Sequence, residues 1–382
     1  MTSPVPAPAT SPPTLTDLAA ERFPLVPRRK PVCRSLADRA DRVRHLADLA
    51  GQTHEEPLRR GAEAHNLAAL IASDCGLPEL ARDLCWRQFD IFAAHGPHDE
   101  QTAKATLQPL VNLGRLHTRD GNGTAAYQLL RDLLRGAKGL ADATVDGRAI
   151  AFDAIVRPGD DHRAVVQWLW TILLADGLRA LCRAGRWPEA LHQAEQHNGV
   201  GQRLYDGRQV AVITRCLDGH PDAAIALLEQ TATAEPWELA VAACLKVMCL
   251  SWAEQQTTAA IAAMAAAYLA LREPAEHALF MVRLGLVAVE LAGDAASVEP
   301  MIERIESTAA ACADAYAAKE ILTSGAAGRL TELASPTLAA AVQAASLGAG
   351  MPPDLRETLL RSVGDGERAL REALLNARPA IS

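Results

Sequence analysis

A short pattern, a glycine followed five residues later by a small or apolar side chain, recurs along this chain at nearly constant spacing. It begins at residues 185, 219, 293, 328 and 364, with Gln255 in the glycine position of one further copy, so the intervals are 34 to 38 residues. Two earlier copies begin at Gly76 and Gly121. Glycine ends a helix at low cost because it adopts left-handed backbone angles, and an interval near this length accommodates two helices of ~14 residues with their turns. The pattern predicts stacked helical hairpins.

The composition agrees with helices packed closely on one another. Hydrophobic residues make up 49% of the 382 residues, but aromatic residues make up only 4%. Abundant alanine and leucine favour helices, and no stretch alternates apolar and polar residues for long enough to predict a strand. The region 139–161 is the one doubtful place, because Ile150, Phe152, Ile155 and Val156 lie there between turn residues.

One copy of the pattern carries further residues typical of a known repeat. Asn112-Leu113-Gly114 is followed by Gly121 and Ala126 at the spacing of the tetratricopeptide repeat, which the chain resembles over about residues 62–376. The resemblance implies an all-α solenoid of stacked antiparallel helix pairs, which winds into a right-handed superhelix with a concave face. In such an array each pair contacts only the next one.

The composition along the chain predicts four segments. Residues 1–32 are rich in proline, serine and threonine, so we expect a disordered tail. Residues 33–138 are expected to form N-terminal helical repeats, and 139–161 an irregular insertion. Residues 162–382 are expected to form C-terminal repeats, of which the charged, amphipathic stretch 353–376 suits a polar cap.

In the family that the chain resembles, fixed positions of the first helix of each repeat face the groove. Carried onto this sequence, that register gives nine binding-groove candidates: Asn112, Arg115, Arg119, Asp176, Arg179, Arg183, Gln209, Lys246 and Arg283. Most of them are cationic although the chain has a net charge of −8, and guanidinium groups on a concave face suit carboxylates, acidic peptides or phosphates. The alternative is that these are ordinary solvated arginines on helix surfaces.

A polar stretch before two tryptophans interrupts the repeat. Its candidate residues are Asp160, Asp161, His162, Arg163, Trp168 and Trp170. One interpretation is a binding loop that folds over the concave face and offers carboxylate, imidazole and guanidinium groups. The other is an exposed loop in which an aspartate caps the next helix, with both tryptophans in helix packing.

The sequence contains no HExxH, GxSxG, GxGxxG or Walker A motif, and its histidines and cysteines lack metal-ligand spacing, so we expect no cofactor and no metal. The acidic balance argues against a nucleic-acid partner, and the longest apolar run, 259–271, is too short to cross a membrane. The start of the chain has no leader pattern, and eight cysteines without CxxC pairs favour free thiols in the cytoplasm.

These observations favour a non-enzymatic scaffold or adaptor that holds a protein or peptide partner, acidic in character, in an arginine-lined groove. A regulatory or sensor module that acts on a separate effector chain is an alternative. A pathway-associated enzyme or accessory protein with a pocket at 157–170 is another. The sequence leaves the oligomeric state open.

Overall fold

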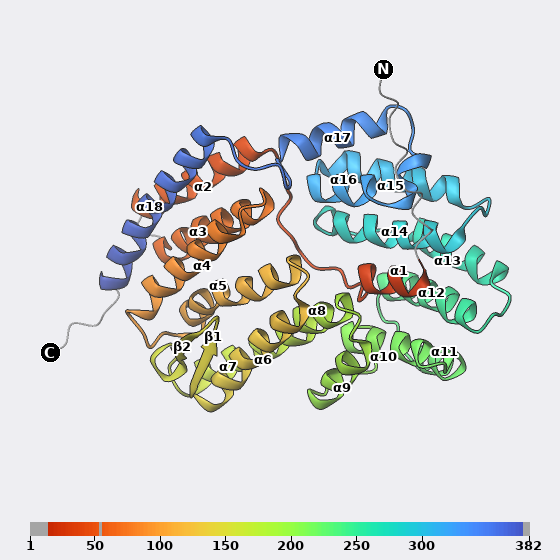
Figure 1. Cartoon of the computed structure of the whole chain (residues 1–382), viewed down its shortest axis with the longest axis horizontal. Coiled ribbons are helices and arrows are strands. Elements are labelled where there is room, and N and C mark those ends of the chain that lie inside the picture. Colours follow the sequence, from red (N-terminus) through yellow and green to blue (C-terminus); the bar gives the residue numbers. More distant parts are fainter. Residues whose placement is uncertain (1–13, 53–55, 377–382) are drawn as a thin grey trace, which may run out of the picture.

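The computed structural model describes residues 14–52 and 56–376, and almost all of its regular structure is helical (Figure 1). The all-α prediction is confirmed. The first half contains α1 Leu15–Arg22, α2 Leu36–Gln52, α3 Pro57–Asp74, α4 Pro78–Ala93, α5 Glu100–Arg119, α6 Gly123–Gly139, β1 Asp142–Val145, β2 Arg148–Ala151, α7 Asp160–Ile172, α8 Leu178–Arg183 and α9 Trp187–Gln196. The second half contains α10 Asp206–Leu217, α11 Pro221–Glu229, α12 Pro236–Trp252, α13 Thr258–Ala270, α14 Ala278–Ala292, α15 Val298–Cys312, α16 Ala315–Leu322, α17 Ala334–Ala344 and α18 Pro353–Asn376.

Consecutive helices pack in pairs: α3 with α4, α5 with α6, α8 with α9, α10 with α11, α12 with α13, α14 with α15, and α16 with α17. A π-helical turn, Leu173–Gly177, joins α7 to α8. Around the molecule the pairs follow one another in a ring (Figure 1). We call the inner face of this ring the concave face. Four of the first helices, α3, α5, α8 and α14, contribute residues to a cavity there, and α10 and α16 bind the extended N-terminal segment described below.

The glycine turns lie where the repeat pattern predicts them. Glycines 76, 121, 185, 219 and 293 all have φ between 60° and 81°, and Glu254 takes the left-handed position beside Gln255. Four of the alanines five residues later, at 81, 126, 190 and 224, are fully buried. A Cβ at Gly114 would come within 3.1 Å of a Leu130 methyl group, so this glycine lets α5 approach α6 closely.

Two of the weaker copies of the pattern are not turns. Gly328 belongs to a short 3-10 helix, Gly325–Arg329, and Gly364 lies inside α18. The sequence 353–376 keeps its amphipathic period across Gly364, and burial of Leu359 and Val363 against other helices continues the helix through it.

The last helix closes the array onto its beginning. Helix α18 packs against α2 and α3, and a Cβ at Gly61 would lie 2.7 Å from Leu370 Cγ. Backbone hydrogen bonds from Gly348 N to Asp74 O and from Gly350 N to Cys75 O fix the loop before α18 to the end of α3. The expectation that each pair contacts only the next is therefore wrong at the two ends. The predicted cap is instead a seam between the ends.

The N-terminal prediction also needs a correction. Residues 1–13 lie outside the described residues, but 15–22 form α1, and the chain then runs extended across the centre of the ring to α2 (Figure 1). We call residues 23–34 the strap. Phe23, Leu25 and Cys33 are buried, so a disordered tail over 1–32 is wrong from residue 14 onward. The prediction of disorder rested on the proline-rich composition, which does not show that other parts of the fold cover the apolar side chains of this segment.

The insertion at 139–161 contains a two-stranded antiparallel hairpin in which Asp142 is opposite Ala151 and Val145 is opposite Arg148. Its turn residues, Asp146 and Gly147, both have positive φ, as a two-residue hairpin turn requires. The sequence reading missed these strands because each is only four residues long.

Among the described residues, one continuous helical stretch, Asp160–Arg183, has the length and apolar composition that a membrane span would need, and half of its apolar window is buried inside the molecule. All eight cysteines are free. Seven are buried and Cys312 is half-buried.

Candidate functional site

The strap lies on the concave face and is held there through its backbone. Gln209 of α10 accepts a hydrogen bond from Leu25 N at 2.7 Å and donates one to Leu25 O at 2.8 Å. Arg179 of α8 donates to Pro24 O at 2.5 Å. A side-chain amide in this arrangement satisfies both polar groups of one residue of an extended chain, so the strap is bound in the manner of a peptide ligand.

The other end of the strap is fixed to α16. Asp314, the residue before this helix, accepts a hydrogen bond from Cys33 N at 3.0 Å, and Ala315 N donates to Cys33 O at 2.9 Å. Near the middle, Arg28 forms an ion pair with Asp206 of α10. These contacts bind the strap to α8, α10 and α16, and the strap faces α3 and α5 across a cavity.

A cavity of about 420 Å³ lies between the strap and the wall formed by α3, α5, α8 and α14. One part of its lining is apolar: Leu25, Val26, Leu70, Leu116, Leu279 and Phe280. Another part is cationic: Arg28, Arg29, Lys30, Arg115, Arg119, Arg179 and Arg283. Asp176 is the acidic residue in the lining. The volume lies within the range of small-ligand sites in proteins, roughly 300–1,000 Å³.

The structure brings together six of the nine residues that the register selected. The six that line the cavity are Asn112, Arg115, Arg119, Asp176, Arg179 and Arg283. Gln209 is fully buried and holds the strap. Arg183 is exposed away from the cavity lining, and Lys246 pairs with Glu229 on the surface, so these two do not belong to the site.

The strap itself contributes cations that sequence reasoning missed, namely Arg28, Arg29 and Lys30. All three fall within the segment 1–32 that the composition predicts to be a disordered tail. The signal available was the apolar block 23–26, which only Pro27 separates from three basic residues. A segment that is only a solvated tail has no need of several large apolar side chains so close together.

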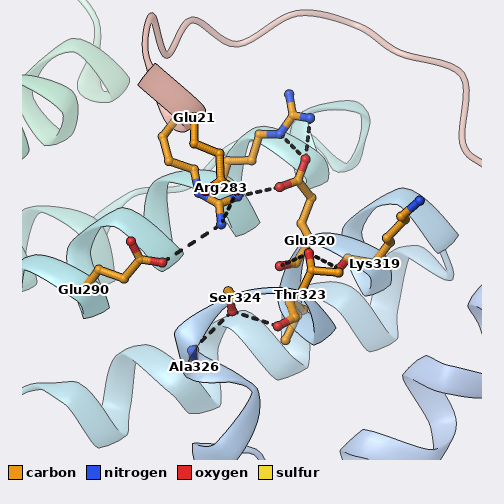
Figure 2. A network of polar contacts seen from close by, with 10 residues as sticks. Glu21, Arg283, Glu290, Lys319, Glu320, Thr323, Ser324 and Ala326 are labelled. Atoms are coloured by element: carbon orange, nitrogen blue, oxygen red, sulfur yellow. Dashed lines mark hydrogen bonds and ion pairs between the residues drawn. The ribbon is translucent and has the colours of Figure 1, made fainter. Parts of the chain in front are cut away.

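Most cations of the lining have a carboxylate partner. The pairs are Arg115 with Asp176 at 2.8 Å, Arg119 with Asp74 at 3.2 Å, Arg283 with Glu320 at 2.5 Å, Arg28 with Asp206 at 2.5 Å, and Arg29 with Glu276 at 2.9 Å. Glu320 also accepts from Arg22 of α1, so one carboxylate lies between two guanidinium groups (Figure 2). Burial acts to raise the pKa of Glu320, but Arg283 and Arg22 outweigh it and lower that pKa.

Lys30 differs from these arginines. Its Nζ lies 3.5 Å from the centre of the Tyr316 ring, and within 14–52 and 56–376 no carboxylate lies within ion-pair distance of it. Burial, followed by repulsion from Arg283 and Arg119, lowers the pKa of Lys30 to about 8. Burial and the nearby Arg28 lower the pKa of Arg179 to about 10. The cavity therefore holds positive charge at a cost in free energy.

A second, shallower hollow of about 240 Å³ adjoins the cavity along α3, α5 and α7, and Asn66 lines both. A row of amide side chains follows this part of the concave face. Gln108 donates to Asn112 at 3.1 Å, and Asn112 donates to Asn66 at 2.5 Å. Lys104 and Trp168 complete the lining on the far side.

The residues of the polar stretch do not converge on one point. Asp160 and Arg163 pair with each other at the surface, Asp161 accepts from Glu100 N at 2.9 Å, and His162 donates to Ala137 O at 2.6 Å. Trp170 donates from Nε1 to His197 O, and Trp168 lines the second hollow.

The hairpin lies against the second helices of two pairs rather than over the concave face. Its Asp146 pairs with Arg82 of α4, its Arg148 pairs with Asp90 of α4, and β1 packs on α6. The hairpin therefore lies on the side of the second helices and away from the cavity.

Within the described ranges no three histidine, cysteine, aspartate or glutamate side chains are grouped so as to hold a metal ion. No protein-family model, no curated protein and no solved structure matches this chain.

Proposed function

We propose that the chain is an interaction protein that binds an extended peptide segment of a partner on the α3, α5 and α7 part of its concave face. The helix pairs with glycine turns support a tetratricopeptide-like solenoid, bent so far that its ends meet. The lining of the hollow of about 240 Å³ along α3, α5 and α7 contains no strap residue, so a partner segment bound there would not have to displace the strap.

The observation that carries the proposal is the binding of the strap itself. Gln209 holds the backbone of Leu25 through both atoms of its side-chain amide. Asn66 and Gln108 present the same chemical group to the second hollow, whose lining contains no strap residue, and Asn112, which is hydrogen-bonded to both, lines the neighbouring cavity. Amide side chains recognise any extended backbone, and the neighbouring side chains supply the selectivity.

The charges beside this amide row favour a partner with acidic side chains. Lys104 lies at one end of the row, and Arg115 and Arg119 lie at the other. Each has an intramolecular acid partner, Glu100, Asp176 or Asp74, so an incoming carboxylate would compete for a guanidinium or ammonium group already in position. The net gain from such an exchange is modest, and the backbone contacts have to supply most of the affinity.

The test is selection of random twelve-residue peptides against the purified full-length chain, followed by fluorescence anisotropy on the recovered peptides. We expect Asn112→Ala to weaken their binding about tenfold, which corresponds to ~1.4 kcal/mol and to the loss of hydrogen bonds to one peptide unit. Arg115→Glu should weaken peptides that carry acidic residues more than peptides that do not.

The matched control is Lys246→Glu, which changes a cation outside the groove by the same charge. Circular dichroism should give each variant a helix content equal to that of the parent chain. Failure to recover any peptide, or equal affinity of the recovered peptides for Asn112→Ala, Lys246→Glu and the parent, contradicts the proposal.

A further inference from the structure

The cavity beneath the strap has more positive charge than its carboxylates neutralise. Arg179 and Lys30 line it, and within the described part of the chain neither has a carboxylate within 4.0 Å. Two of the acids behind the wall are shared, because Asp74 accepts from both Arg39 and Arg119 while Glu320 accepts from both Arg22 and Arg283. The wall thus retains an excess of cations in a partly buried place.

These cations gather at one part of the cavity. Arg283 is close enough to repel both Lys30 and Arg179, and Arg119 also repels Lys30. Repulsion and burial together disfavour the charged forms of these groups, which lowers the pKa of Lys30 to about 8. An anion placed among them would reverse both effects, since it supplies the missing opposite charge and hydrogen-bond acceptors.

The apolar part of the lining indicates which kind of anion would fit the cavity. Leu279 and Phe280 of α14 and Leu25 and Val26 of the strap present apolar surface to the same cavity of about 420 Å³. A bare inorganic ion would leave this surface against water. A small molecule with an apolar body and one anionic group would use both parts of the lining, in the way that ligand pockets combine apolar walls with a few polar groups.

We propose that this cavity is a binding site for a small organic anion, with its carboxylate or phosphate group held by Lys30, Arg179 and Arg283 and its apolar body against Leu279 and Phe280. The site adjoins the proposed peptide groove, because Asn66 and Asn112 of the amide row also line this cavity, but the cations that would hold the anion are not part of that row. Because Lys30 belongs to the strap and Arg283 to α14, the bound anion would also join the strap to the wall. Occupancy of the cavity would then control how firmly the strap is held.

The first experiment measures binding of four probes to the full-length chain by isothermal titration calorimetry. The probes are phenyl phosphate, phenylacetate, inorganic phosphate and uncharged benzyl alcohol. We expect at least one of the two aromatic anions to bind more tightly than inorganic phosphate, and benzyl alcohol not to bind. The comparison of phenyl phosphate with phenylacetate identifies which anionic group the site prefers.

Substitutions locate the site. Lys30→Met removes the charge and keeps an apolar stem, and it should weaken the preferred anion at least tenfold. Lys30→Arg should retain most of the affinity, and Lys246→Met, outside the cavity, should leave it unchanged. Equal binding by Lys30→Met and the parent, or no binding of either aromatic anion up to about 10 mM, overturns the proposal.

A second measurement needs no substitution. The chain has five lysines, so acetylation followed by mass spectrometry reports on each separately: Lys30, Lys104, Lys138, Lys246 and Lys319. The preferred anion should slow acetylation of Lys30 at least threefold near pH 8, because it raises the protonated fraction and covers the amine. The other four lysines should react at unchanged rates, and equal protection of all five, or of none, counts against the site.

The same samples show the effect on the strap by hydrogen exchange. The anion should slow exchange of the backbone amides of residues 25–33, and the amides of α12 should serve as the internal reference. Because none of these experiments involves a peptide, their failure leaves the peptide proposal intact, and failure of peptide selection leaves the anion proposal intact.

Discussion

At the scale of single residues, a few buried polar side chains fix how distant segments meet. Gln209 joins α10 to the strap, and Asp74 joins α3 to α2, α5 and α16 through Arg39, Arg119 and Tyr316. Each of these side chains has partners far away in the sequence, so no local pattern reveals its role. The family resemblance selected Gln209 as a groove residue, but only the structure identifies what it holds.

His65 shows how a buried residue at the seam makes stability depend on pH. It lies on α3 opposite Glu367 of α18, and Glu367 is already engaged by Arg87 at 2.8 Å. Burial, followed by repulsion from Arg87, lowers the pKa of His65 to about 4 from 6.5. Between these values the unfolded chain binds the proton more strongly, so stability should fall as the pH falls, by about 3 kcal/mol in all.

The measurement is urea unfolding near pH 7 and near pH 5. His65→Gln removes the titrating group, and this variant should lose about 2 kcal/mol less than the parent between the two conditions. If the parent and the variant show the same pH dependence, His65 does not contribute in this way.

At the scale of elements, the repeat pattern predicted the hairpins well and the strap not at all. The glycine turns follow from local backbone geometry, and the buried alanines follow from the close approach of the two helices of a pair. Short stretches such as 121–126 contain the residues that determine both features. The strap is different, because its extended form has no local cause. It is ordered by partners on α8, α10 and α16, and composition alone cannot show that those partners exist.

The strap should therefore loosen when its partner amide is removed. Gln209→Ala leaves the N–H and C=O of Leu25 without partners in a buried place, at a cost of roughly 1–3 kcal/mol for each group. We expect hydrogen exchange of residues 24–33 to accelerate at least tenfold, while the helices α12 to α15 keep their protection. Exchange of the strap at the parent rate would show that its side chains, rather than Gln209, hold it.

At the scale of the whole molecule, the ends of the array meet, and this too escaped sequence analysis. The amphipathic period of 353–376 predicted a helix with one apolar face, and that helix is present as α18. The pattern could not show that α2 and α3 cover this face, since the overall curvature of stacked helix pairs accumulates from small rotations between successive pairs. The cavity depends on the same closure, because its cations come from the strap, α5, α8 and α14 together.

Closure makes a quantitative prediction for α18. Leu370 is fully buried against α3, whereas Leu375 of the same helix is 57% exposed. Leu370→Ala should cost about 2–5 kcal/mol, and Leu375→Ala should change stability by no more than about 0.5 kcal/mol. Guanidinium unfolding measures both, and small-angle scattering should show a larger radius of gyration for the Leu370 variant under mild denaturing conditions. Equal costs for the two substitutions would mean that the seam does not hold the ends together.

The strap crosses the centre of the ring (Figure 1) and covers the cavity of about 420 Å³ on the concave face. Open arrays of helix pairs can change their curvature and so wrap around a folded partner. In this chain the strap crosses the ring and the seam joins the two ends. The array therefore cannot stretch or wrap around a partner unless the seam opens or the strap is released. A partner that binds on the concave face therefore has to be as slender as an extended peptide or a small molecule. A folded domain could bind only on the outer surface.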